Sequence, residues 1–309
     1  MGLSKMQKLI IGCGYVGLQV AQKWLEQGHT VSALTRSELH ADKFTTLGIK
    51  PIIGDITQPE SLKNLPQTDT LLYAVGFDRS ANRSRHEIYV TGLNHVLSEI
   101  KGRTQKIIYL SSTSVYGQSS GEWVDETSEC TPQRENGQIC LEAEQLFEKQ
   151  GLISAEEDLT ISRAVILRLA GIYGPGRLLA RMEQIKAGEP LLGRPDAYLN
   201  LIHVTDIVNT ILKFDTDIQL ESHYLVSDNC PITRQEYYET LAFILNAPLP
   251  QFATEATRQG AMKSNRSNST ERAAGLNKRC NNRKLRGIPG LELVYPTIKE
   301  GLPQAIENR

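Results

Sequence analysis

The sequence predicts an α/β protein: a doubly wound parallel sheet with a smaller, interleaved C-terminal lobe. Two observations predict it. Short apolar runs typical of buried strands alternate with segments of helical periodicity from the N-terminus to about residue 175, as in parallel sheets. The alternation then breaks and returns more than once before the C-terminus. We therefore expect a sheet domain over 1–175 and 201–228, and a lobe over 176–200 and 229–309.

Each expected strand is a short run rich in Ile, Leu, Val or Ala that ends at glycine, polar or turn-forming residues. In chain order, the runs are Leu9–Ile11, Val31–Leu34, Lys50–Ile53, Asp69–Val75, Gln105–Leu110, Ala164–Leu169 and Tyr224–Val226. One helix is expected directly after the first run, and another over His86–Ile100, whose apolar residues recur on one face. The carboxyl ends of parallel strands share one edge of the sheet, and ligands of such sheets bind there.

The turn after the first strand carries the pattern GxGxxG, as Gly12, Gly14 and Gly17. In such a turn the first glycine permits a tight bend, the second lets backbone N–H groups approach a pyrophosphate, and the third lets the helix lie close to the strand. The helix N-terminus then faces the anion. The sequence therefore predicts a dinucleotide site that also includes Tyr15 and Val16, although the pattern alone also fits an ordinary glycine-rich turn.

The end of the second strand indicates which dinucleotide is bound. An NAD site usually places a carboxylate there, for the ribose hydroxyls, whereas a 2′-phosphate needs a cation. This chain has Thr35 and Arg36, and a guanidinium suits a phosphate group. NADP is therefore expected. NAD remains the alternative if Glu38 or Asp42 reaches back to the ribose, or if Arg36 is only a solvated surface residue.

Two further strand ends should line the same crevice. Asp55 follows the third strand, and Ala74 and Val75 end the fourth. Asp55 is expected to meet the adenine edge of the dinucleotide, and its alternative role is that of a turn or cap aspartate.

Composition excludes several classes of partner. A net charge of −1 and a pI near 6.6 provide no field that would attract nucleic acid or an anionic membrane. The five cysteines are widely and irregularly spaced, with no pair typical of a metal site or of redox exchange. The N-terminus shows no targeting segment and no apolar run of membrane-spanning length. We therefore expect a cytoplasmic protein with no metal.

A basic segment, Arg258–Arg286, has many Asn and Ser residues and little periodicity. It is expected to form a loop. One hypothesis makes it a flap that grips a substrate diphosphate through Arg266, Arg272 or Arg279. The alternative is a solvated insertion.

The fifth strand ends in Ser111–Gly117, with the sequence SSTSVYG. This run resembles the fifth strand of the extended short-chain dehydrogenase/reductases, the NAD(P)-dependent epimerase/dehydratase group, which have a Rossmann fold. Several later segments extend the resemblance over nearly the whole chain: WVDET at Trp123–Thr127, RLAGIYGPGR at Arg168–Arg177, NLIHVTD at Asn200–Asp206, YLVSD at Tyr224–Asp228 and YPTIKEG at Tyr295–Gly301.

In that family, a Ser or Thr at the position of Ser112 acts with a Tyr-x-x-x-Lys pair, in which the lysine lowers the pKa of the tyrosine. Matching Glu144 to the glutamate of the family places Asn136 at the tyrosine position and Cys140 at the lysine position. An amide exchanges no proton near neutral pH, and a thiol supplies no fixed positive charge. The departure resembles the atypical branch of the superfamily.

The candidate catalytic residues are therefore Ser112, Tyr116 and Tyr173, with His203 as a further source of a proton. Packing is the alternative role for the two tyrosines, and a structural role is the alternative for the histidine.

The resemblance implies an oxidoreductase, epimerase or dehydratase that acts on a small-molecule substrate, such as a sugar nucleotide or a similar carbonyl or alcohol compound. A catalytically silent NADP-binding sensor or scaffold is the alternative, since one fold hosts both. The resemblance also suggests a homodimer formed through the helices near 86–100 and 137–150.

Overall fold

The computed structural model describes residues 5–78, 82–153, 164–177, 181–216, 221–253 and 276–307. The chain forms two compact units that alternate along the sequence. The first unit consists of Met1–Val115, Pro132–Arg168 and Ile207–Tyr224, and the second of Tyr116–Thr131, Leu169–Asp206 and Leu225–Arg309.

The sequence led us to expect a sheet domain over 1–175 and 201–228. Four segments within those ranges, 116–131, 169–175, 201–206 and 225–228, group with the second unit. In the first three of these segments, short strands pair with partners of the second unit in small sheets of their own.

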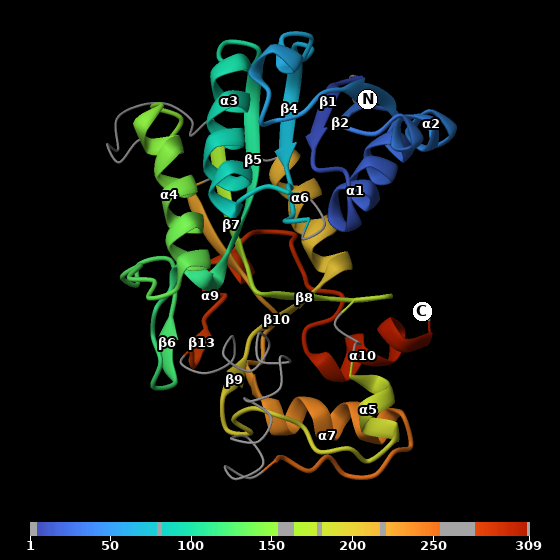
Figure 1. Cartoon of the computed structure of the whole chain (residues 1–309), viewed down its shortest axis with the longest axis vertical. Coiled ribbons are helices and arrows are strands. Elements are labelled where there is room, and N and C mark those ends of the chain that lie inside the picture. The colour runs from blue at the N-terminus through green and yellow to red at the C-terminus, as the bar shows by residue number, and fades with distance from the viewer. Residues whose placement is uncertain are drawn as a thin grey trace. The chain divides into compact units, whose positions relative to one another are not determined.

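The main sheet has seven strands in the order β11-β7-β5-β4-β1-β2-β3, and every strand expected from the sequence is present in it (Figure 1). The strands are β1 (Gln7–Ile11), β2 (Thr30–Thr35), β3 (Lys50–Ile53), β4 (Thr68–Tyr73), β5 (Thr104–Ser112), β7 (Ala164–Leu169) and β11 (His223–Val226). Pairing is parallel, with Ile11 of β1 opposite Leu34 of β2 and Tyr73 of β4. The doubly wound α/β architecture is therefore confirmed.

The helices of the first unit alternate with these strands. They are α1 (Tyr15–Glu26), α2 (Glu38–Thr46), a 3₁₀ turn η1 (Pro59–Leu62), a π-helical turn η2 (Glu87–Thr91), α3 (Gly92–Glu99), a 3₁₀ turn η3 (Thr113–Val115), α4 (Glu135–Lys149) and α6 (Val204–Thr216), whose first residues lie in the second unit. The helix expected over 86–100 is thus present, but it begins with a π-helical turn. Such turns are rare and frequently lie at functional sites.

Alternate side chains of the strands contact helices on opposite faces of the sheet. Leu9, Tyr73 and Tyr109 belong to a core that includes residues of α3 and α4. Lys8 and Thr70, on the opposite face, contact Trp24 of α1 and Asp215 of α6. The sheet is therefore covered by helices on both faces.

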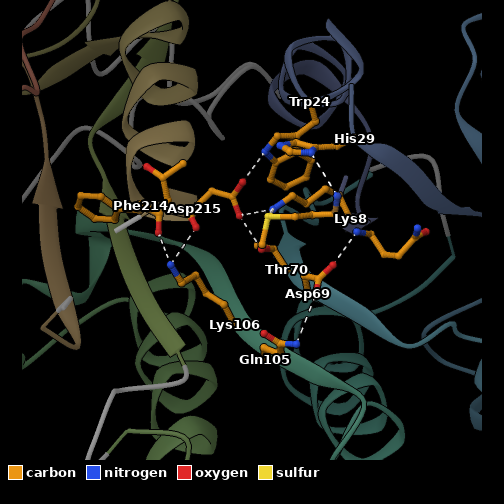
Figure 2. Close-up of polar contacts among 12 residues, drawn as sticks. Lys8, Trp24, His29, Asp69, Thr70, Gln105, Lys106, Phe214 and Asp215 are labelled. Atoms are coloured by element: carbon orange, nitrogen blue, oxygen red, sulfur yellow. Dashed lines mark hydrogen bonds and ion pairs between the residues drawn. The ribbon is translucent and has the colours of Figure 1, made fainter. Parts of the chain in front are cut away.

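A buried polar cluster lies under α1 and α6 (Figure 2). Asp215 accepts hydrogen bonds from Lys8 Nζ at 2.7 Å, Thr70 Oγ1 at 2.5 Å and Trp24 Nε1 at 3.0 Å. Lys106 Nζ donates to the carbonyl oxygens of Phe214 and Asp215. Lys8 and Asp215 are almost fully buried, so they form a buried ion pair whose remaining polar contacts are these hydrogen bonds.

The second unit has its own core, formed by residues such as Tyr173, Leu201, Tyr237 and Leu302. Its strands are β6 (Glu122–Val124), β8 (Gly171–Tyr173), β9 (Tyr198–Leu199), β10 (Leu201–His203), β12 (Ile232–Thr233) and β13 (Lys278–Cys280). Its helices are α5 (Met182–Lys186), α7 (Arg234–Ile244), α9 (Arg283–Arg286) and α10 (Ile298–Glu307). Within the described ranges of the chain, no helix has the length and apolar character needed to cross a membrane.

Candidate functional site

The order of strands β2, β1 and β4 creates the crevice where a ligand of this fold binds. In the sheet, β1 lies between β2 and β4. The chain runs from β1 to β2 and β3 on one side and then returns to β4 on the other side, so the strand order reverses between β1 and β4. Open parallel sheets bind ligands at such a switch point, outside the carboxyl ends of the strands. Gly12 and Ala74 follow those two strand ends.

The glycine turn has the geometry that its sequence predicts. Gly12 has φ +92°, and a Cβ there would lie 2.5 Å from the backbone of Ala74 and Val75. A Cβ on Gly17 would lie 2.7 Å from the carbonyl oxygen of Gly12, because α1 packs directly against the turn. Both positions therefore require glycine for steric reasons.

Gly14 differs from both. It precedes α1, and no described atom lies within 4 Å of the position that a Cβ would take there. Its N–H donates to the Gly12 carbonyl at 2.8 Å, which shapes the turn. The space beside Gly14 is thus open at the N-terminus of a helix, where backbone N–H groups and the helix dipole favour an anion. Tyr15 and Val16 form the first turn of this helix, and Val16 is buried.

Thr35 is the last residue of β2, and Arg36 follows it. The Thr35 hydroxyl is buried and accepts a hydrogen bond from Ser37 N at 3.2 Å, so it shapes the turn into α2. Arg36 is half-exposed, and its Nη2 lies 3.7 Å from a carboxylate oxygen of Asp78, beyond the end of β4. An exposed pair of this length is weak, so the guanidinium can exchange Asp78 for another anion.

Asp55 forms the local turn that was its alternative role. Its Oδ1 accepts hydrogen bonds from Thr57 N and Thr57 Oγ1, both at 2.9 Å. Ser61 Oγ accepts from the Asp55 backbone N–H. Since both bonds use Oδ1, the second carboxylate oxygen has no hydrogen bond within the described part of the chain.

The two serines at the end of β5 have different roles because neighbouring side chains of a strand point to opposite faces. Ser111 is buried and donates to Glu144 Oε1 at 2.5 Å. Glu144 also binds Arg168 of β7 through Nε and Nη2, with a shortest distance of 2.8 Å. This buried ion pair fixes α4 against β5 and β7.

Ser112 lies beside the N-terminal half of α4. Its Oγ accepts a hydrogen bond from Ser114 N at 3.1 Å, so its own proton remains available to another acceptor. A Cβ on Gly137 of α4 would lie 2.3 Å from the Ser114 carbonyl oxygen, so this glycine brings the helix close to the serines. Cys140 and exposed Asn136 lie one and two helical turns before Glu144, on the same side of α4.

Cys140 remains a thiol near neutral pH. Burial raises its pKa, and the smaller effects of a hydrogen bond with Ser114 and of the positive charge of Arg85 lower it. Residue 140 therefore carries no positive charge near neutral pH. The cation that affects it is Arg85, in the segment just before η2.

Arg85 was not among the predicted site residues. It lies just before η2, and its guanidinium stacks on the ring of Phe77, which follows β4, at 4.1 Å. Its neighbours Arg83 and His86 pair with Glu87 and Glu142, whereas Arg85 has no ion pair among the residues that the structure describes. No sequence motif pointed to it, because the approach of this segment to α4 depends on tertiary packing.

Tyr116 and Tyr173 belong to the second unit and are both fully buried. Burial raises the pKa of Tyr173, and the negative charges of Asp228, Asp206 and Glu300 raise it further. A Cβ on Gly301 would lie 2.1 Å from the Tyr173 hydroxyl, which shows tight packing around it. These features favour the packing role for Tyr173.

His203 is fully buried between two hydrogen-bonding partners. Its Nδ1 accepts from Thr205 N at 3.2 Å, and its Nε2 lies 2.9 Å from Gln304 Oε1. Burial lowers the pKa of the imidazole. Both ring nitrogens thus have partners within the described residues, which favours the structural interpretation of His203.

The hypothesis of a basic flap is tested only at Arg279, since Arg266 and Arg272 lie outside the described residues. Arg279 Nε donates to the Gly121 carbonyl oxygen at 2.7 Å, and its guanidinium lies about 5 Å from the rings of Trp123 (4.9 Å) and Tyr198 (5.1 Å). It therefore joins β13 to β6 and β9. Across the described ranges, no group of three or more His, Cys, Asp or Glu residues is placed to hold a metal ion.

Comparison with known proteins places the site in context. The model of the NAD dependent epimerase/dehydratase family matches residues 9–226. Protein YeeZ of Escherichia coli K12 is 26% identical over 253 residues, which cover 79% of this chain and 85% of that protein.

Two solved structures share the fold. One, from Methylobacillus flagellatus and described as an NAD-dependent epimerase/dehydratase, is 28% identical, with a TM-score of 0.73 over 98% of both chains. The UDP-glucose 4-epimerase of Thermotoga maritima, solved with UDP-glucose, is 18% identical, with a TM-score of 0.77 over 98% of both chains.

Proposed function

Because the chain belongs to the NAD dependent epimerase/dehydratase family, we propose that it is an oxidoreductase, epimerase or dehydratase that binds NADP at the Gly12–Gly17 turn. The open space beside Gly14 carries this proposal. It lies at the N-terminus of α1, between two glycines that are fixed by close packing, and so provides room for a pyrophosphate next to backbone donors.

Arg36 supports NADP over NAD. A 2′-phosphate offers the guanidinium a more highly charged partner than the Asp78 carboxylate, which lies 3.7 Å away and is half-exposed. NAD binding would leave Arg36 with Asp78. Asp55, Ala74 and Val75 are proposed to line the adenine and ribose part of the same crevice.

Ser112 and Arg85 are the groups that we assign to the reacting end. The Ser112 hydroxyl can donate to a substrate oxygen, because its own oxygen already accepts from Ser114 N. Arg85 supplies a fixed positive charge close to Cys140, on the side of α4 that faces the serines. Bound NADP would supply or accept the hydride.

The substrate class proposed is a carbonyl or alcohol compound, for which a sugar nucleotide is the first choice. The Thermotoga maritima structure supports that choice at the level of the fold. Tyr116 and Tyr173 are the weaker candidates for proton transfer, since both rings are fully buried and burial and close packing oppose ionisation of Tyr173.

A second candidate is an NADP-binding protein without turnover. One observation favours it: α4 carries an exposed amide at Asn136 and a thiol at Cys140 whose pKa is raised by burial, and neither group can exchange a proton near neutral pH.

Fluorescence titration with NADPH and NADH tests the cofactor proposal, and tighter binding of NADPH is expected. Absence of binding for both nucleotides would remove the proposed function. A thermal-shift panel of sugar nucleotides on the NADP-loaded protein then tests the substrate class. With any substrate that is turned over, Ser112→Ala should lower kcat by about 10² or more, as expected for the loss of a donor to a reacting oxygen. The matched variant Ser98→Ala, at an exposed position of α3, should leave kcat unchanged.

A further inference from the structure

The second unit contains a cavity of about 370 Å³. It is lined by Asn229, Leu285, Arg286, Leu291, Glu292 and Leu293. Sites for small molecules have volumes on the order of 300–1,000 Å³, and they combine a largely apolar lining with a few polar groups that orient the ligand. Three leucines and three polar residues give this cavity a lining of that kind.

The leucines form the apolar part of the cavity wall. Leu285, on α9, and Leu291 are 1% and 9% exposed, so packing of the unit holds both side chains in place. Between them the chain turns at Gly290, whose φ of +74° favours glycine, and the Leu291 N–H donates to the Ile288 carbonyl oxygen at 3.2 Å. This turn brings residues 291–293 to the same cavity as α9.

The buried side chain of Asn282 positions two of the polar groups. Asn282 is 3% exposed, and its Oδ1 accepts a hydrogen bond from Arg286 Nε at 3.0 Å. Its Nδ2 donates to Asn229 Oδ1 at 2.9 Å and to the Ser227 carbonyl oxygen at 2.8 Å. Among the residues that the structure describes, the terminal nitrogens of Arg286 and Nδ2 of Asn229 have no partner. These donors are therefore oriented by a buried network and remain available to a ligand.

Glu292 brings a negative charge to the same cavity. It is exposed, and its carboxylate has no hydrogen bond or ion pair within the described ranges of the chain. Arg286 and Glu292 therefore line one cavity without pairing with each other. A cation and an anion arranged in this way complement a molecule that carries both charges. Glu292 repels a phosphate, and a neutral molecule leaves both charges without a partner.

We propose that this cavity binds an α-amino acid with an apolar side chain. Arg286 pairs with the α-carboxylate, since a guanidinium binds a carboxylate with two parallel hydrogen bonds, and Asn229 Nδ2 adds a further donor. Glu292 pairs with the α-ammonium group. The side chain of the amino acid packs against the three leucines, which removes apolar surface from water. The site uses neither NADP nor the glycine turn, so it does not rest on the proposed function.

Calorimetric titration of the whole chain with L-leucine tests this site, and saturable binding is expected. Arg286→Gln and Glu292→Gln should each raise the Kd for L-leucine at least about tenfold, because each removes a charge-assisted contact. Arg283→Gln is the matched control: it removes an exposed arginine of the same helix that does not line the cavity, and it should bind L-leucine as the wild type does. The Kd for NADPH, measured on the same preparations, should be unchanged in all three variants, which separates this proposal from the proposed function.

Two analogues of leucine separate the roles of the two charged groups. 4-Methylpentanoate lacks the ammonium group, and leucinamide lacks the carboxylate. The wild type should bind each of them at least about tenfold more weakly than L-leucine. Glu292→Gln should bind 4-methylpentanoate at least as tightly as the wild type does, because the substitution removes a repulsive charge, and Arg286→Gln should bind leucinamide at least as tightly for the same reason. A substitution that only disturbed the fold would weaken the binding of every probe.

Thermal unfolding gives a second readout. L-leucine should raise the Tm of the wild type and of Arg283→Gln, and it should leave the Tm of Arg286→Gln and Glu292→Gln unchanged. Absence of saturable binding by the wild type at millimolar L-leucine would overturn the proposal. So would binding of L-leucine by Arg286→Gln or Glu292→Gln within twofold of the wild type, or equal affinity of the wild type for L-leucine and 4-methylpentanoate.

Discussion

Replacement of each glycine of the first turn by alanine should separate folding from nucleotide binding. At Gly14 the new methyl group meets no described atom within 4 Å, but φ −99° is combined with ψ −138°, outside the ordinary extended and helical regions. Backbone strain in such a region costs about 1–3 kcal/mol, and the lower entropy of the unfolded chain offsets about 0.4–1 kcal/mol of this cost. Without a steric conflict, the free energy of unfolding should therefore fall by about 0–2 kcal/mol.

Nucleotide binding by Gly14→Ala should fall sharply, because its methyl group occupies the space proposed for the pyrophosphate. Loss of one charge-assisted hydrogen bond costs about 1.5–3 kcal/mol. Since about 1.4 kcal/mol corresponds to a factor of ten, the Kd for NADPH should rise roughly ten- to a hundredfold.

Gly12→Ala and Gly17→Ala should lower the free energy of unfolding through steric conflict. The methyl group at residue 12 lies 2.5 Å from backbone atoms and requires a φ of +92°, which together cost about 2–6 kcal/mol. At residue 17 the conflict with the Gly12 carbonyl costs about 1–3 kcal/mol.

Urea unfolding and NADPH fluorescence titration measure the two quantities on the same three variants. If Gly14→Ala binds NADPH within twofold of the wild type, the open space is not the pyrophosphate site, and the reasoning from the turn is refuted.

Three further predictions concern charged groups. Asp78→Asn frees Arg36 for a 2′-phosphate, so the Kd for NADPH should fall by up to about fivefold, which corresponds to a surface ion pair of up to about 1 kcal/mol. The Kd for NADH should stay constant. Equal changes of the two Kd values in fluorescence titrations would contradict this. Asp215→Asn leaves the charge of Lys8 buried without its partner, so the free energy of unfolding measured in urea should fall by about 3–5 kcal/mol. A fall of less than about 1 kcal/mol would contradict a stabilising role for the cluster in Figure 2. Burial raises the pKa of Asp228 to about 8, so between about pH 4 and 8 the folded chain holds a proton that the unfolded chain has released. Folding stability should then fall with rising pH in that window by up to about 1.4 kcal/mol per unit, and Asp228→Asn should lose less stability than the wild type between pH 5 and 8; parallel curves for the two proteins would refute this.

The geometry of the glycine turn could be predicted because its signals are local. A strand, a glycine turn and a helix lie within a few residues of one another, and the steric demands on Gly12 and Gly17 follow from that local geometry alone. The parallel, doubly wound arrangement of the main strands could be predicted for a similar reason, since alternating strands and helices restrict the chain to few topologies. The order of the strands in the sheet was seen only in the structure.

The alternative roles of several residues needed the structure. His203 had two interpretations from sequence, and its hydrogen bonds to Thr205 and Gln304 favour the structural one. Asp55 uses one carboxylate oxygen for the turn with Thr57, which is compatible with its proposed place in the crevice. A motif gives the residue type and its approximate place. It does not give the partners that satisfy its polar atoms.

The sequence by itself determined the doubly wound sheet, the glycine turn and the hydroxyl-rich end of the fifth strand, because periodicity and turn chemistry act over short distances along the chain. Tertiary structure alone decided which charges lie near those features and which remain unpaired. Arg85 stacks on Phe77 and its charge lowers the pKa of Cys140, although more than fifty residues separate Arg85 from Cys140 in sequence. Electrostatic forces act through space, so the charges that surround a site become known only when the chain is folded.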